Sequence, residues 1–167
     1  AMGDTVTGFA VQPGTNATGA MAVFTRNKLS ILYGLTTSDF KLVPYRDDIG
    51  AWAHTIQDIG YSLFLDDRGI TDIQTSQEFG NFATNAKTAH IQSLMQAYKP
   101  YVISSMICRD KSQYRIFFTN GSGFYITVVG KKIVGIMPVL FPDIVRSTWT
   151  AEDSSGNEVM YFGSDDG

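Results

Sequence analysis

This sequence of 167 residues is poor in cysteine, histidine and charge, and each shortage narrows what the chain can do. Cys108 is the only cysteine, so no internal disulfide can form. Because no activating base lies near it in the sequence, we expect a small buried hydrophobe rather than a nucleophile. The two histidines, His54 and His90, have no cysteine or histidine beside them, so the spacing typical of a metal site is missing.

Long apolar runs and a strong net charge are also missing. No run approaches the ~18 residues of a membrane-spanning helix, and no signal-peptide pattern is present, so we expect neither a membrane span nor export by that route. Charged residues make up 17% of the chain, and its net charge of −3 and pI near 5.2 disfavour general binding to nucleic acid or a membrane surface.

The charge is nevertheless distributed unevenly. Residues 99–132 carry six basic side chains and one acidic, whereas residues 143–167 carry six acidic side chains and one basic. We expect the basic side chains to lie at hairpin turns and strand ends and to meet an acidic neighbour, such as the 143–167 segment of another copy. They are Lys99, Arg109, Lys111, Arg115, Lys131 and Lys132.

Strand-forming residues are plentiful, and four predicted hairpins follow one another along the chain. In each, a short apolar run is followed by a polar turn and a second apolar run. The turns are centred near Asn27, Asp67, Lys111 and Ser155, a step of about 40 to 44 residues. This step is the length of one four-stranded propeller blade. The spacing therefore predicts a rigid β body, which is more typical of binding or assembly than of catalysis.

The fold class expected is all-β and mainly antiparallel, with three to four propeller-like blades in one domain over residues 4–167. The predicted units span 20–46, 52–83, 101–141 and 144–163. Within them, strands are expected at 52–57, 124–129 and 133–139. Ile91, Leu94, Met95 and Tyr98 recur at helical spacing before Pro100, which predicts one short helix near residues 84–98 and most simply a stripe that packs into the core.

Two kinds of motif could suggest chemistry, and both are better explained as turns. Adjacent aspartates at 47–48, 66–67 and 165–166 each lie near a glycine, as turn residues do, and a calcium loop would need more regularly spaced oxygen ligands. Gly130-Lys131-Lys132 resembles part of a phosphate loop, but no serine or threonine follows the lysines. We therefore expect no catalytic, cofactor-binding or metal-binding residues.

The sequences at the two ends of the chain indicate how this stretch relates to the natural protein. Ala1-Met2-Gly3 resembles a cloning scar. Residues 163–167 form a Gly/Asp turn that normally leads into another strand, so we expect a piece of a longer protein. A natural C-terminus in a polar tail is the alternative.

Four stretches carry a family resemblance: residues 24–34 (FTRNKLSILYG), 48–51 (DIGA), 64–70 (FLDDRGI) and 77–80 (QEFG). Their order over about residues 20–163 resembles propeller-type tail and connector proteins of tailed bacteriophages, similar to packaged-DNA stabilisation, tail hub and tubular tail proteins. The resemblance implies a virion structural protein, mounted in a ring below the portal and without catalytic residues.

The sequence thus leads to a non-enzymatic assembly component of a phage or prophage particle, made in the bacterial cytoplasm and located in the virion. Expected partners are other copies of the chain and neighbouring virion proteins, with no cofactor, no membrane and no specific nucleic acid. A carbohydrate-binding or glycoside-hydrolase-type propeller is the alternative. A cluster of carboxylates and aromatic residues at one propeller mouth would favour that alternative.

Overall fold

The computed structural model describes residues 3–11, 20–73, 92–130 and 132–166, and these residues form mainly antiparallel strands. Among these residues, strands account for 54%, and the bounded helical elements are the α-helix α2 (Gln92–Tyr98) and the 3₁₀ turn η3 (Lys99–Tyr101). The predicted all-β, mainly antiparallel class is therefore confirmed.

The strands form four sheets, and within each sheet they pair in chain order. Sheet A contains β1 (Val6–Val11), β2 (Ala20–Thr25), β3 (Leu29–Tyr33) and β4 (Lys41–Arg46). Sheet B contains β5 (Gln57–Asp58), β6 (Ser62–Leu65) and β7 (Ile70–Asp72). Sheet C contains β8 (Val102–Cys108), β9 (Gln113–Phe118), β10 (Ser122–Val129) and β11 (Lys132–Leu140). Sheet D contains β12 (Ser147–Glu152) and β13 (Glu158–Gly163).

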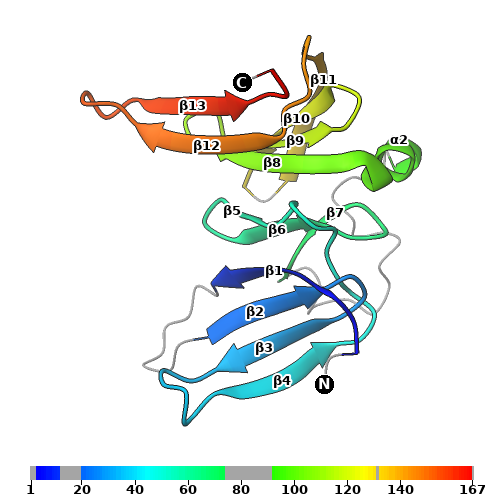
Figure 1. Cartoon of the computed structure of the whole chain (residues 1–167), viewed down its shortest axis with the longest axis vertical. Coiled ribbons are helices and arrows are strands. Elements are labelled where there is room, and N and C mark those ends of the chain that lie inside the picture. Colours follow the sequence, from blue (N-terminus) through cyan, green and yellow to red (C-terminus); the bar gives the residue numbers. More distant parts are fainter. Residues whose placement is uncertain (1–2, 12–19, 74–91, 131, 167) are drawn as a thin grey trace.

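The sheets follow one another in chain order along the long axis of the molecule (Figure 1), with an apolar core between neighbours. The core between sheets A and B contains Ala22, Phe24, Leu29, Ile31 and Phe64. The core between sheets B and C is the largest and contains Leu63, Leu65, Ile70, Met95, Tyr114, Ile116, Phe118 and Ile126. Sheets C and D enclose Met106, Phe117 and Val145. Burial of this apolar surface is the main force that holds the stack together.

A segment between β4 and β5 fixes sheet A against sheet B. The backbone N–H of Ala51 donates to the carbonyl of Thr25 at 2.9 Å, and that of Trp52 donates to the carbonyl of Leu65 at 2.8 Å. Gly50 lies so close to the β2–β3 turn that a Cβ there would be 2.3 Å from the carbonyl carbon of Arg26. Glycine at position 50 is therefore what allows the linking segment to contact both hairpins.

All four predicted hairpins are present, but they are not equivalent. In sheets A and B the hairpin joins the second and third strands (β2–β3 and β6–β7), whereas in sheets C and D it joins the first and second (β8–β9 and β12–β13). The evenly spaced turns therefore do not occupy the same position in each sheet. The pattern of apolar strands and polar turns predicts a hairpin, but it does not show whether that hairpin is the first or the second of its sheet.

Other local expectations have mixed outcomes. The strands expected at 124–129 and 133–139 are β10 and β11. The strand expected at 52–57 is wrong, because the backbone turns at His54 (φ 62°) and β5 begins only at Gln57. The helix is confirmed over 92–98; Met95 lies in the core while Leu94 is exposed, and residues 84–91 lie outside the described part of the chain.

Candidate functional site

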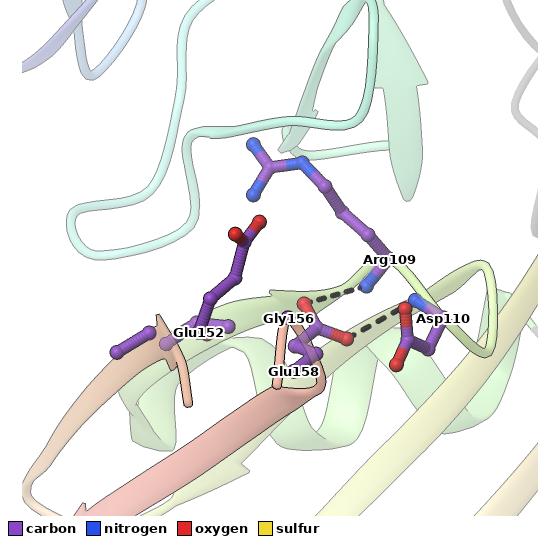
Figure 2. A pocket seen from close by; sticks show the side chains of 7 residues that line it. Arg109, Asp110, Glu152, Gly156 and Glu158 are labelled. Carbon is purple, nitrogen blue, oxygen red and sulfur yellow. Dashed lines mark hydrogen bonds between the residues drawn. The ribbon is translucent and has the colours of Figure 1, made fainter. Parts of the chain in front are cut away.

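One cavity among the described residues lies between the tips of sheets C and D. This pocket has a volume of about 370 Å³ and is lined by the β8–β9 turn, the end of β12, the β12–β13 turn and the first residue of β13. Figure 2 shows the side chains of Arg109 and Glu152 extending into the same open space, while Glu158 turns towards the β8–β9 turn. The remaining lining residues are Asp110, Thr150, Ala151 and Gly156.

Glu158 holds the β8–β9 turn against β13. Its carboxylate accepts hydrogen bonds from the backbone N–H of Arg109 at 2.9 Å and of Asp110 at 3.1 Å (Figure 2). Burial opposes ionisation of Glu158, but these two N–H groups, together with the Cys108 thiol and the charge of Arg109, lower the pKa of the carboxyl. A carboxylate that is held ionised by two donors is poorly suited to donate a proton.

A second cavity, of about 180 Å³, lies where turns of sheets A and B meet. Asp67 forms ion pairs with Arg26 and, at 3.0 Å, with Lys99. The guanidinium of Arg26 also lies over the ring of Trp52, 4.1 Å from its centroid. Asp48 binds Arg46 at 2.9 Å. These contacts join the β2–β3 turn, the β6–β7 turn and the segment after α2.

The neighbouring carboxyls of Asp66 and Asp67 are in opposite electrostatic situations. Asp66 is buried, and this desolvation raises its pKa although its Oδ1 accepts the N–H groups of Arg68 and Gly69 at 2.7 and 3.0 Å. Burial also opposes ionisation of Asp67, but Lys99 and Arg26 outweigh it and lower its pKa. The predicted turn role is confirmed for Asp66.

Cys108 lies in β8, and His54 lies in the link before β5. Cys108 is buried as predicted, and burial raises the pKa of its thiol. His54 is exposed in the link before β5, and His90 lies outside the described residues. Within the described ranges, no group of three or more histidine, cysteine, aspartate or glutamate side chains could hold a metal ion. Nor is any described helix long and apolar enough to cross a membrane.

The expectation that all the basic residues of 99–132 project from tips is wrong at Arg115. Its side chain lies within β9 and is 4% exposed, because its guanidinium stacks on the ring of Tyr125 at 3.9 Å. Lys99 is paired with Asp67 of its own chain. Arg109, Lys111 and Lys132 are exposed, and Lys131 lies outside the described residues.

Neither Glu158 nor Arg115 could have been selected from the sequence. Glu158 lies 49 residues after its partner Arg109, and Arg115 occupies an ordinary strand pattern.

Comparisons with models of protein families, with curated proteins and with solved structures found no match.

Proposed function

We propose that this chain is a non-enzymatic structural component of a tailed-phage particle, and that two copies close into a propeller-like ring of eight sheets. The main support for this proposal is that sheets A and D, the first and last of the stack, each have one face packed on a neighbouring sheet and one bare apolar face. The expected partners are a second copy and neighbouring virion proteins. The family resemblance of residues 24–34 and 64–70 supports placement in the virion.

The bare face of sheet A is a continuous apolar surface. Strand pairing aligns Val11, Met21, Leu32 and Leu42 in one row that crosses all four strands. Phe9 lies on the same face two residues before Val11 and is 58% exposed. Side chains of the opposite face, such as Ala22 and Ile31, are buried against sheet B. Exposed apolar surface of this extent is typical of protein contacts.

Sheet D has a matching bare face. Trp149 and Tyr161 are directly opposed on β12 and β13 and are 68% and 56% exposed. The alternate residues Thr148 and Thr150 point the other way, since their hydroxyls donate to carbonyls of β8. An aromatic pair of this kind is a common anchor at interfaces.

In the proposed ring, sheet D of each copy packs on sheet A of the other copy. A two-fold axis relates the two contacts, so the bare faces of both copies are covered. The order of the strands supports this arrangement, because β5, β8 and β12, the first strands of their sheets, lie next to one another. In a propeller, the first strand of each blade lies next to the central axis, beside the first strands of the neighbouring blades. Propellers usually have four to eight blades, so a ring of eight sheets is within that range.

Sedimentation velocity over a wide concentration range tests the ring. We expect a species of twice 18.4 kDa, which Leu42→Asp or Trp149→Asp should convert to monomer. Val134→Asp is the control, because Val134 is 63% exposed but lies on β11 of sheet C, away from both end faces. A wild-type chain that stays monomeric throughout contradicts the ring.

Placement in the virion needs a separate test. Antibodies raised against this chain should label purified phage particles from the bacterium that encodes it, with particles of an unrelated phage as control. Absence of the chain from such particles, by labelling and by mass spectrometry, contradicts the structural role.

A further inference from the structure

Sheet D covers only half of the face of sheet C on which it lies. The hydroxyls of Thr148 and Thr150 reach the carbonyls of Ser105 and Ile107, at 3.0 and 3.2 Å, which places β12 over β8 (Figure 1). On β13, the sulfur of Met160 accepts from Arg115 of β9. The two strands of sheet D thus lie over the first two strands of sheet C.

The extensive contact of the described strands of sheet D with sheet C is that of β12 with β8, which leaves β10 and β11 outside it. Tyr125 and Met137 continue the row of Met106 and Arg115 across the sheet, and Met137 is 52% exposed. A Cβ added to Gly135 would meet nothing within 4 Å. The opposite face of these strands is covered, because side chains such as Ile126 lie in the core against sheet B. The bare face is therefore an open continuation of the core between sheets C and D.

Among the described strands, the one that borders this bare face, β13, has a free edge. Sheet D has two strands, so β13 pairs with β12 on one side and with no described strand on the other. Sheets A and C have four strands each, and there the strand in the equivalent place pairs with a third. A free strand edge with an apolar floor beneath it is the arrangement that β-strand addition uses.

A buried positive charge lies at the border of the same surface. Nε and Nη2 of Arg115 donate to Oε1 of Gln113 at 3.0 and 2.8 Å, and Nη1 donates to the Met160 sulfur at 3.0 Å. None of these acceptors is a carboxylate, and two of the five guanidinium N–H groups have no acceptor among them. A buried cation whose described acceptors are all neutral is costly, so this position favours an acidic partner group.

We propose that an extended segment of a partner protein adds to the free edge of β13 as the third strand of sheet D. Its alternate apolar side chains cover Tyr125 and Met137, and one of its carboxylates approaches Arg115. Main-chain hydrogen bonds to β13 supply affinity, and the apolar surface of Tyr125 and Met137 together with the buried cation determines which partner sequences bind. The site differs from the bare end faces of sheets A and D, so it does not depend on the two-copy ring.

A second copy of this chain does not fit by pairing its own β13. The two-fold axis of an antiparallel edge pair is perpendicular to the sheet, so both copies would have their sheet C on the same side. The second sheet C would then occupy the space of β10 and β11 in the first copy. The strand that binds to β13 must therefore come from a segment that has no sheet packed on the side facing β10 and β11.

The probe is a synthetic peptide, Lys-Val-Thr-Glu-Thr-Val-Thr-Lys, with valine and glutamate on one face. We expect saturable binding in a fluorescence titration, together with slower hydrogen exchange of β13 amides. Met137→Asp should weaken binding about tenfold, a loss expected when a charge replaces an apolar contact. Replacing the peptide glutamate by glutamine should weaken it less, and replacing its central threonine by proline should abolish it.

The control is Leu42→Asp, which changes the bare face of sheet A and should leave peptide binding unchanged while it disrupts the ring. Met137→Asp should do the reverse and leave the sedimenting species unchanged, which also shows that the variant is folded. The proposal is overturned if the peptide shows no saturable binding, if β13 gains no protection, or if Met137→Asp and Leu42→Asp weaken binding equally.

Discussion

The hydroxyl of Tyr114 donates a 2.8 Å hydrogen bond to the carbonyl oxygen of Thr55, across the boundary between sheets B and C. Tyr114 is fully buried, and burial raises the pKa of its hydroxyl, so the group stays protonated and able to donate. The hydroxyl of Thr55 in turn donates to the carbonyl of Trp52 at 2.6 Å and accepts from the N–H of Leu65 at 3.2 Å. The irregular link before β5 is thus anchored by polar contacts within the largest core.

Tyr114→Phe should lower the free energy of unfolding by about 1–2 kcal/mol, because it leaves the buried carbonyl of Thr55 without its donor. Urea unfolding measures the change. Tyr33→Phe is the matched control, since Tyr33 is exposed at the end of β3 and its loss of a hydroxyl should cost little. Equal stability of the two variants would mean that the Tyr114 hydrogen bond contributes nothing net.

The two adjacent aspartates should respond oppositely to removal of charge. At neutral pH, Asp66→Asn should leave the free energy of unfolding unchanged or raise it, because the amide oxygen can still accept the turn N–H groups while the cost of burying a charge disappears. Asp67→Asn should lower it, because Arg26 and Lys99 lose their carboxylate. Paired urea titrations of both variants against wild type provide the comparison.

The pH dependence of stability separates these two groups further. Asp67 has a lowered folded pKa, so its stabilisation is present above the unfolded pKa near 3.8 and is lost as pH falls through the folded value. Asp66 has a raised folded pKa, so its contribution is greatest below 3.8 and is lost as pH rises through its folded value. Asp67→Asn should therefore flatten the acid loss of stability, and Asp66→Asn should steepen the net acid loss. The same slope in both variants would contradict this assignment.

Glycine at position 50 should be far less replaceable than glycine at position 135. A Cβ at Gly50 would overlap the backbone of Thr25 and Arg26, which cannot move without opening the β2–β3 hairpin. Gly50→Ala should cost about 3 kcal/mol or more, or prevent folding. Gly135→Ala meets open space on β11 and should be nearly neutral. Thermal unfolding of the two variants measures the contrast, and similar melting temperatures would show that the linking segment can shift.

Much of sheets A and C was predictable because their strands are bounded by strong turn residues. Asn120 and Gly121 marked the β9–β10 hairpin, and the apolar run from Ile133 marked β11. What the sequence did not reveal are contacts between sheets. The charge of Arg115 is visible in the sequence and predicts a position at a tip, whereas its burial depends on Tyr125 and on Met160, which lies 45 residues away. The bare half of sheet C likewise depends on how many strands sheet D contributes.

Glu158→Gln should loosen the β8–β9 turn. The carboxylate accepts from two backbone N–H groups, and an amide has one acceptor oxygen in place of two. We expect faster hydrogen exchange at Arg109 and Asp110 and unchanged exchange in sheet A, which lies at the other end of the stack (Figure 1). Glu152→Gln is the control, because no hydrogen bond joins Glu152 to these N–H groups (Figure 2). Unchanged exchange in the Glu158 variant would show that the turn is held by packing alone.

The chain should bind duplex DNA weakly or not at all near physiological salt. Affinity for DNA depends on the number of phosphate contacts. Of the basic residues in 99–132, Lys99 is neutralised by Asp67 and Arg115 is buried, so too few free cations remain for a strong phosphate-binding surface. Joint replacement of Lys131 and Lys132 by glutamate should therefore leave DNA binding at background in an electrophoretic mobility assay. The same change should weaken a charge-dependent contact with an acidic partner at low salt and have little effect at high salt, where charges are screened. Tight, sequence-independent DNA binding that the double replacement abolishes would instead favour a nucleic-acid function.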